Sequence, residues 1–297
     1  MDDIAVLANP GAGRGRHRGV FSAVLDRLGS RGGTVRLLEA GSAEDAEKVC
    51  HRAVADGVGA LVAVGGDGTL HRALQAVAGT DVGFGVVPAG TGNDFAAGTG
   101  VPAHPLLAAE EIAVAREAGR HRPIDLARIE TPQGDVRWFG AVLAAGFDAI
   151  VNERANRLRW PRGPRRYDLA IMLEAVRLRP RRYTLDLDGV DHSFTGVLAA
   201  VGNCASYGGG LRICPAADPA DGLLDVVVAA PLGRVALARL QPRVRRGTHV
   251  DDPLITSYRA RRVRIDTPGI VGYADGERVA ALPLEIGCVP GAVRLLR

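Results

Sequence analysis

Two glycine-rich segments of this chain carry acidic residues that a simple turn does not need. Gly65, Gly66, Asp67, Gly68 and Thr69 follow the apolar run 61–64, and segment 88–95 follows the next apolar run, at 85–87. Glycines let backbone N–H groups approach an anion closely, and a carboxylate beside such a phosphate cradle is typical of a bound Mg²⁺. A structural turn would use only one or two glycines. The two segments together therefore predict a nucleotide-phosphate site with its metal, and Thr91, Asn93 and Asp94 add polar groups to it.

A third glycine-rich segment follows the first apolar run of the chain and consists of Asn9, Pro10, Gly11, Ala12 and Gly13. It lacks the third glycine of a dinucleotide fingerprint, and the chain contains no Gly-Lys-Ser/Thr of a P-loop. Two interpretations stay open. The segment is either an ordinary turn between strand and helix or an anion-binding nest at a helix N-terminus, with Arg14, Arg16 and Arg18 as phosphate donors.

Acidic residues recur near the end of the chain. Asp275-Gly276-Glu277 is by itself a common hairpin signal, but Glu277 or Asp275 could also accept the proton of an attacking hydroxyl. The stretch 218–225 is likewise a loop in the first place, and Asp221 with nearby backbone carbonyls would suit a hard cation.

The elements that must position these residues change character along the chain. In the first 120 residues, apolar runs at 4–8, 34–38, 61–64 and 82–87 alternate with helical patterns at 17–29, 43–56 and 69–78, which predicts a parallel sheet with crossover helices. After Pro123, alternating segments at 136–143, 183–187, 193–201, 223–228, 263–267 and 272–274 are separated by tight-turn signals. This pattern predicts a mostly antiparallel β domain, with a boundary near residues 120–123.

Composition limits the function classes. The chain has 297 residues, of which 47% are hydrophobic and 24% charged, and this is enough for two domains. Its net charge of +4, without a recognition motif, argues against nucleic acid as a partner. The four cysteines show no metal-type spacing, the N-terminus does not have the order of a signal peptide, and no apolar run reaches the roughly 18 residues of a spanning helix. We expect a cytoplasmic protein, either fully soluble or in peripheral contact with the inner face of the membrane. A homodimer is compatible with the sequence, which does not specify the oligomeric state.

Residues 154–182 are rich in arginine, with Trp160, Tyr167 and several aliphatic residues between the arginines. A solvated helical face is the plainer interpretation, because most charge runs are simply surface. The alternative is contact with an anionic membrane, since arginine together with interfacial Trp and Tyr suits a headgroup layer.

Seven motifs occur in an order that resembles the diacylglycerol kinase catalytic-domain family, which includes bacterial diacylglycerol and lipid kinases, sphingosine kinases and, distantly, NAD kinases. They are Asn9-Pro-x-x-Gly13, Gly65-Gly-Asp-Gly-Thr69, Pro88-x-Gly-Thr-x-Asn-Asp-Phe95, Gly146-Phe147-Asp148, Gly208-Gly-Gly210 with Pro215, Asp221-Gly222 and Asp275-Gly-Glu277. The resemblance covers nearly the whole chain. It implies an N-terminal α/β ATP-binding domain of NAD kinase-like fold over residues 1–122 and a C-terminal β-sandwich domain for the lipid over residues 123–285. The chain end, about 286–297, would return to the first domain.

The resemblance also implies roles for individual residues. Asn9 to Gly13, Gly65 to Leu70 and Thr91 would contact ATP, with Asn93 and Asp94 beside them, and Glu277 would accept the proton. Asp67, Asp94, Asp125 and Asp275 match an aspartate network that organises water around the active-site Mg²⁺. Asp221, with main-chain oxygens of Asp218 and Leu223, would hold a second, structural Mg²⁺. The position after Asp94-Phe95 is often basic in the family but is Ala96 here. Arg14 or Arg16 would then supply the cation.

We therefore predict an ATP- and Mg²⁺-dependent lipid kinase that converts diacylglycerol to phosphatidic acid. Two alternatives stay open. One is a kinase for another lipid or lipid-linked alcohol, such as a sphingoid base, and the other is a non-catalytic regulator of the same fold that binds nucleotide or lipid.

Overall fold

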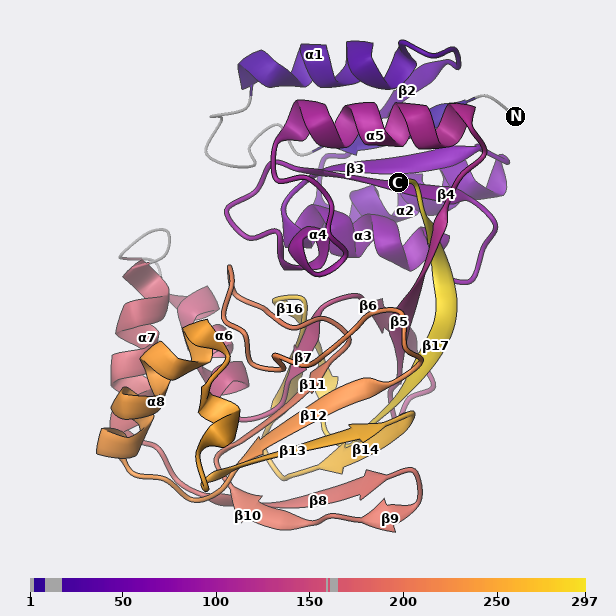
Figure 1. The fold of residues 1–297 in the computed structure, drawn as a ribbon. Helices are drawn as coiled ribbons and strands as arrows, with labels where there is room; N and C mark the ends of the chain where they lie inside the picture. Colours follow the sequence, from indigo (N-terminus) through magenta and orange to yellow (C-terminus); the bar gives the residue numbers. More distant parts are fainter. Residues whose placement is uncertain (1–2, 9–17, 159, 161–164) are drawn as a thin grey trace.

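The computed structural model describes residues 3–8, 18–158, 160 and 165–297, and they form two stacked halves (Figure 1). The first half holds a parallel sheet in the order β4-β3-β1-β2, and the second holds antiparallel strands that form a β-sandwich. The predicted fold class is confirmed.

The elements of the first half alternate as the sequence predicts. They are β1 (Ile4–Ala8), α1 (Arg18–Gly29), β2 (Val35–Leu38), α2 (Ala43–Ala55), β3 (Ala60–Gly65), α3 (Asp67–Val77), β4 (Gly83–Pro88), α4 (Asp94–Gly98) and α5 (Pro105–Glu117).

Helices cover both faces of the parallel sheet, so its strands are apolar on both sides. In β1, Ala5 and Leu7 pack against α2 and α3, while Ile4 and Val6 pack against α1 and α5. Figure 1 shows α1 and α5 on one side of the sheet and α2 and α3 on the other. The loops after β1 to β4 consequently leave the sheet at one common edge.

The second half contains most of the remaining strands and a layer of three helices. Its elements are β5 (Arg122–Glu130), β6 (Val136–Phe139), β7 (Val142–Ala144), α6 (Phe147–Arg157), α7 (Arg165–Val176), β8 (Arg181–Leu187), β9 (Val190–Asp191), β10 (Phe194–Gly196), β11 (Leu198–Gly202), β12 (Leu224–Ala229), α8 (Arg234–Arg246), a 3-10 turn (His249–Asp251), β13 (Ile255–Ala260), β14 (Arg262–Asp266), β15 (Val271–Ala274), β16 (Glu277–Ala281) and β17 (Leu284–Leu295).

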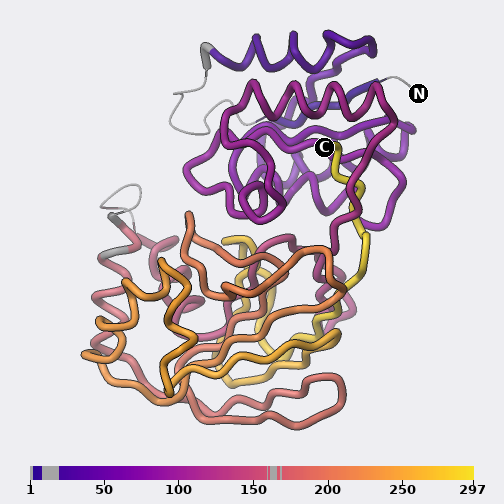
Figure 2. Tube along the Cα trace, in the orientation of Figure 1, coloured from indigo at the N-terminus to yellow at the C-terminus, as the bar shows by residue number. Residues whose placement is uncertain are grey.

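Two sheets enclose the core of this half. The first contains β10-β8-β14-β17 and continues through β17 into β4 of the parallel sheet, and the second has the order β13-β12-β11-β7-β15-β16. Side chains from both sheets, such as Leu143, Tyr183, Val226 and Ile265, meet in one buried cluster. Strand β17 pairs with β5 over most of its length, and its end, at Arg294 and Leu295, pairs with β4. Figure 2 shows the C-terminus in the same half of the molecule as β4.

Two predicted strands are wrong as single elements. Segment 136–143 divides into β6 and β7, which belong to different sheets, because the N–H groups of Gly140 and Ala141 between them bind the Asp275 carboxylate instead of a neighbouring strand. Segment 193–201 divides into β10 and β11 at Val197, where the chain crosses from one sheet to the other. In both segments, the alternating pattern continues through the point where the chain changes sheets. This alternation alone therefore could not reveal the break between the two strands.

Candidate active site

A cavity of about 630 Å³ lies at the common edge of the parallel sheet. Its lining comes from the ends of β1 and β2, the start of α2, the turns after β3 and β4, and the hairpin before β16. The described residues that line it are Leu7, Ala8, Ala40, Gly41, Ser42, Ala43, Ala46, Gly66, Asp67, Gly68, Thr69, Arg72, Gly90, Thr91, Gly92 and Glu277.

The turns after β3 and β4 touch each other, and only glycines permit this contact. A Cβ atom on Gly90 would lie 2.3 Å from the Cα of Gly66, and a Cβ on Gly92 would lie 2.8 Å from Asp67 Oδ2. The Asp67 N–H donates to the carbonyl of Gly92 at 3.1 Å. The structure thus brings together the two segments that the sequence singled out.

Asp67 begins helix α3 and is the carboxylate that the two turns share. Its Oδ1 accepts the N–H of Asp94 at 2.8 Å. Burial raises the pKa of Asp67 to about 7, and the nearby carboxylates of Asp94 and Asp275 add to this rise. Burial and the neighbouring carboxylates disfavour the negative charge of Asp67, and a bound cation would offset both effects.

Asp94 ties a loop of the second half to the first half. Its carboxylate accepts the Ser206 hydroxyl at 2.9 Å and the N–H groups of Gly209 and Gly210 at 2.7 and 2.8 Å. The Tyr207 hydroxyl, in the same loop, donates to Asp148 at the start of α6 at 3.1 Å. The loop therefore bridges α4 and α6.

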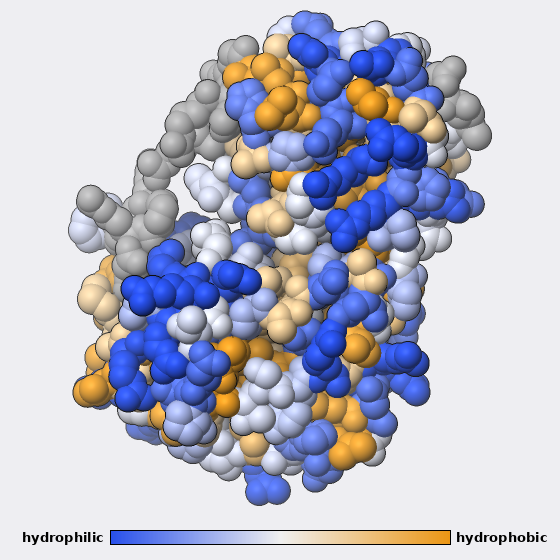
Figure 3. Space-filling view, in the orientation of Figure 1, coloured by the Kyte–Doolittle hydropathy of each residue, from blue (hydrophilic) through white to orange (hydrophobic). Residues whose placement is uncertain are grey.

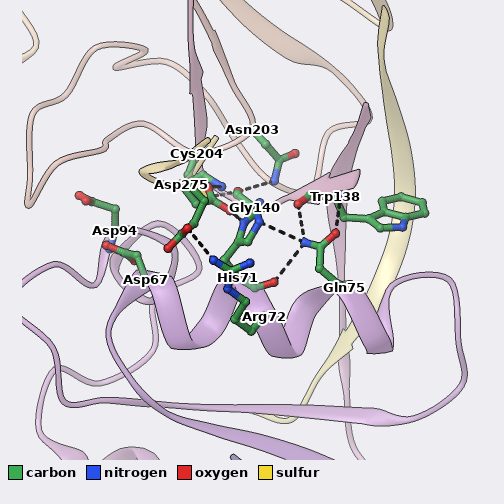
Figure 4. A network of polar contacts seen from close by, with 12 residues as sticks. Asp67, His71, Arg72, Gln75, Asp94, Trp138, Gly140, Asn203, Cys204 and Asp275 are labelled. Carbon is green, nitrogen blue, oxygen red and sulfur yellow. Dashed lines mark hydrogen bonds and ion pairs between the residues drawn. The ribbon is translucent and has the colours of Figure 1, made fainter. Parts of the chain in front are cut away.

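Asp275 is held in place from both halves of the molecule (Figure 4). It accepts the N–H groups of Gly140 and Ala141 at 3.1 and 2.9 Å and lies 3.2 Å from Nδ1 of the buried His71 in α3. Gln75 donates to the carbonyl of Trp138 at 2.8 Å and accepts the Trp138 N–H at 2.9 Å, which orients its amide. The same amide also donates to the His71 carbonyl at 3.1 Å, and its nitrogen lies 3.5 Å from the ring Nε2 of His71. Because a carboxylate only accepts, the Nδ1–H of His71 is the donor to Asp275.

Glu277 lies over the first turns of α3. Its Oε2 is 2.6 Å from a guanidinium nitrogen of Arg72, and its Oε1 would be 3.2 Å from a Cβ on Gly68. Its side chain is 35% exposed, and it lines the cavity beside Gly68. A carboxylate in this position can reach a group that enters the cavity.

Asp125 and the loop 218–223 form a separate cluster that does not line the cavity. The Asp125 carboxylate accepts the N–H groups of Gly222 and Gly291 at 2.7 and 2.8 Å. Asp221 accepts the Leu223 N–H at 3.0 Å and forms an ion pair with Arg259, and Asp218 accepts the N–H of Ala220 at 3.1 Å. The Arg259 guanidinium lies beside Asp221 in the structure. The second, structural Mg²⁺ implied for Asp221 with the main-chain oxygens of Asp218 and Leu223 stays a prediction.

The predicted residues thus divide into groups. Gly66, Asp67, Gly68, Thr69, Thr91 and Glu277 line the cavity, whereas Gly65, Leu70, Asn93, Asp94, Asp125 and Asp275 lie outside its described lining. Asn9, Pro10, Gly11, Ala12 and Gly13, together with Arg14 and Arg16, lie outside the described residues.

Sequence reasoning missed His71, Arg72, Gln75 and the start of α2. The available signal for His71 and Arg72 was helical spacing, since they follow Asp67 and Gly68 by four residues each and must share their faces of α3.

The donors near Asp67 fit one Mg²⁺ that is bound jointly with a nucleotide. Among the described residues, no three acidic, histidine or cysteine side chains are grouped as ligands of a metal ion. A magnesium ion commonly takes one or two carboxylates and completes its shell with phosphate oxygens and water. Asp67 lines the cavity, and its Oδ2 lies 2.8 Å from the position of a Cβ on Gly92, so this carboxylate would be the protein ligand of the ion.

Known proteins with similar sequences support this picture. Residues 3–129 match the family model of the diacylglycerol kinase catalytic domain, and residues 141–297 match that of the YegS C-terminal NAD kinase beta sandwich-like domain. The diacylglycerol kinase of Mycobacterium tuberculosis (strain H37Rv) is 44% identical over 99% of this chain and 94% of its own length. A Xanthomonas oryzae protein named "Probable lipid kinase YegS-like" is 34% identical over 84% of this chain and 82% of its own.

Solved structures agree with the fold. A crystal structure of a diacylglycerol kinase from Bacillus anthracis str. Sterne has a TM-score of 0.73 at 20% identity and covers 99% of this chain and 96% of that chain. A second structure from the same organism has a TM-score of 0.81 at 22% identity, with coverages of 99% and 95%.

The family model and the 44% identical relative place the chain among the phosphotransferases with an alcohol group as acceptor. The chain belongs to the diacylglycerol kinase family of lipid kinases, which confirms the resemblance found in its sequence.

Proposed function

We propose that the protein transfers the γ-phosphoryl group of ATP to the hydroxyl of diacylglycerol and that it requires Mg²⁺. The observation that carries the proposal is the cavity that Asp67, the glycine-rich turns and Glu277 line together. The 44% identity with a diacylglycerol kinase supports diacylglycerol as the acceptor.

The residues would divide the work as follows. The turns around Gly66 and Gly90, with Thr69 and Thr91, would hold the phosphates through N–H and hydroxyl groups. Mg²⁺, when bound at Asp67, would neutralise charge on the phosphoryl oxygens. Asp94 and Asp275 would hold the two halves of the molecule, and the hairpin before β16, in position around Asp67.

Glu277 would accept the proton of the lipid hydroxyl. As that oxygen forms its bond to the γ-phosphorus, the bond from the phosphorus to the β–γ bridging oxygen breaks, and ADP leaves with the electron pair. The protonated Glu277 then returns its proton to solvent. Phosphoryl transfer needs in-line positioning and charge neutralisation more than covalent help from the protein, and this set of groups supplies both.

We also propose which part of the chain binds each substrate. Residues 1–122 would bind ATP, residues 123–285 would receive the lipid, and the end of the chain, about 286–297, would belong with the first domain. Support comes from the pairing of β17 with β4 and from β5, which begins at Arg122.

The lipid substrate suggests a membrane-facing surface, and the layer of α6, α7 and α8 has the right chemistry for one. Trp160, Met172, Val176 and Val235 are 78%, 62%, 61% and 85% exposed. Helix α8 carries five arginines and no acidic residue. Figure 3 shows hydrophilic side chains gathered over this layer at the lower left, with hydrophobic ones at its edge. None of the helices in the described residues combines the length and apolar character that crossing a membrane requires. We propose that this layer rests on an anionic membrane.

The assignment of the site is tested by two conservative variants, Asp67→Asn and Glu277→Gln. Each should lose at least 100-fold in kcat, the scale typical of a lost general base or a lost metal contact, while its unfolding midpoint stays close to that of the wild type. Glu285→Gln is the matched control, because Glu285 is exposed and its ion pair with Arg264, at 3.8 Å, lies outside the described lining of the cavity. Equal turnover in all four proteins would refute these roles.

A further inference from the structure

The described lining of the cavity carries little positive charge for a site that holds a nucleoside triphosphate. Its described lining carries two acidic residues, Asp67 and Glu277, and a single basic residue, Arg72. A triphosphate adds several negative charges to the same space. In the described part of the chain, Arg72 is thus the lining residue that can meet them with a guanidinium, the side chain best suited to phosphate.

Arg72 is placed to reach both the phosphates and Glu277. It follows Gly68 by four residues, so the two lie on one face of α3, next to the N-terminal turn where the glycines gather. Its guanidinium is 2.6 Å from Glu277 Oε2 and 3.8 Å from Glu47 Oε2, and its side chain is 23% exposed. A side chain with partial access to the cavity can exchange one anionic partner for another.

Glu47 keeps Arg72 close to the cavity during such an exchange. Its other oxygen is 2.5 Å from Arg137, whose side chain is 46% exposed and does not line the cavity. Arg72 and Arg137 thus share one acidic partner, but only Arg72 also contacts Glu277.

The ion pair restricts how a lipid hydroxyl can approach Glu277. While the guanidinium binds Oε2, the hydroxyl can reach Oε1, on the side of Gly68, but not the direction that the guanidinium occupies. Phosphate oxygens compete well for the same guanidinium, because an arginine can bind them in a bidentate manner.

We propose that Arg72 is a phosphate-binding residue that leaves Glu277 for the nucleotide when ATP enters. ATP binding would then free Oε2 as well, so that both carboxylate oxygens of Glu277 are open to the lipid hydroxyl when the phosphoryl donor is present. This inference rests on the proposed kinase function and assigns it a residue that the sequence did not predict.

The test measures the dissociation constants of ATP and adenosine by calorimetry, with Mg²⁺ present, for the wild type, Arg72→Gln, Arg72→Lys and Arg137→Gln. Arg72→Gln should bind ATP ~10-fold or more weakly, the effect expected for one lost charge-assisted hydrogen bond, and should bind adenosine as the wild type does. Arg72→Lys should recover part of the ATP affinity because it restores the charge. Arg137→Gln should match the wild type with both ligands, although it removes the other partner of Glu47.

The variant Glu277→Gln distinguishes an Arg72 that exchanges Glu277 for ATP from an Arg72 that stays bound to Glu277. If Glu277 competes with ATP for Arg72, this variant should bind ATP several-fold more tightly than the wild type while it loses turnover. If Arg72→Gln and Glu277→Gln both bind ATP with wild-type affinity, the inference about Arg72 is overturned and the proposed kinase function is not affected. A wild-type protein that binds no ATP would overturn the proposed function and this inference with it.

Discussion

At the scale of single residues, Asp148 is a buried carboxylate outside the cavity whose ionisation should be visible in the stability of the protein. Burial raises the pKa of Asp148 to about 6, and the Ala149 N–H and Tyr207 hydroxyl offset this only in part. The folded state therefore holds this proton more tightly than the unfolded chain between about pH 4 and pH 6, and the contribution of Asp148 to stability falls as the pH rises through that range.

The variant Asp148→Asn removes this ionisation and keeps an acceptor for Tyr207. Its free energy of unfolding should exceed that of the wild type by up to ~2 kcal/mol at pH 7 and should equal it near pH 4. Urea denaturation at both pH values measures the difference. Asp135→Asn, at an exposed position, should show no such trend. A variant that is less stable at pH 7 than at pH 4, relative to the wild type, would contradict this account.

His71 acts through Asp275, so its two variants should differ in activity. In His71→Asn, the amide nitrogen can occupy the position of Nδ1 and still donate to Asp275, whereas His71→Leu leaves that carboxylate one donor short. We expect His71→Leu to lower kcat by about 10-fold or more with little change in the KM for ATP, and His71→Asn to restore most of it. Steady-state kinetics of the two variants provide the measurement. Equal kcat in both would show that the hydrogen bond to Asp275 is not what His71 contributes.

At the scale of elements, the contact between the turns after β3 and β4 is the tightest constraint on the site. Gly90→Ala would force a Cβ to within 2.3 Å of the Gly66 Cα, so the turns must separate. We expect a loss of ~1–3 kcal/mol in stability together with a loss of ATP affinity. Gly233→Ala is the matched control, because its Cβ would meet no atom within 4 Å. Thermal unfolding and nucleotide titration of both variants test this, and unchanged ATP binding in Gly90→Ala would be inconsistent with a phosphate cradle at these turns.

The same elements explain what the sequence could and could not predict. The apolar runs and helices of the first half alternate plainly, so their order, and the meeting of Gly66 with Gly90, followed from topology alone. The split of 136–143 at Gly140 did not, because it depends on Asp275, a residue 135 positions away in the chain. Helical spacing could have placed Arg72 beside Gly68, but its pairing with Glu277 requires the hairpin before β16 to fold over α3.

At the scale of the whole molecule, the layer of α6, α7 and α8 should control binding to lipid surfaces. We expect the protein to float with vesicles that contain anionic lipid, to float less with neutral vesicles, and to be released by salt, because arginine–headgroup attraction is screened. Met172→Ser with Val235→Ser should weaken flotation while activity on a soluble short-chain acceptor is unchanged. Val190→Ser is the control, because it alters an exposed valine in β9, which Figure 1 shows on the other side of the second half from this layer. Flotation that is absent, or indifferent to salt, would exclude this surface as an anionic-membrane contact.

The central claim is that the cavity at the edge of the parallel sheet transfers phosphate from ATP to a lipid hydroxyl. It is tested most directly by γ-labelled ATP with the purified protein and mixed micelles of diacylglycerol, sphingosine or ceramide, with NAD as a further acceptor, in Mg²⁺ and in chelator. We predict labelled phosphatidic acid from diacylglycerol, formed in Mg²⁺ and abolished by the chelator. Label on another acceptor would correct the substrate, and no labelled product from any acceptor, in a protein that binds ATP, would contradict the claim.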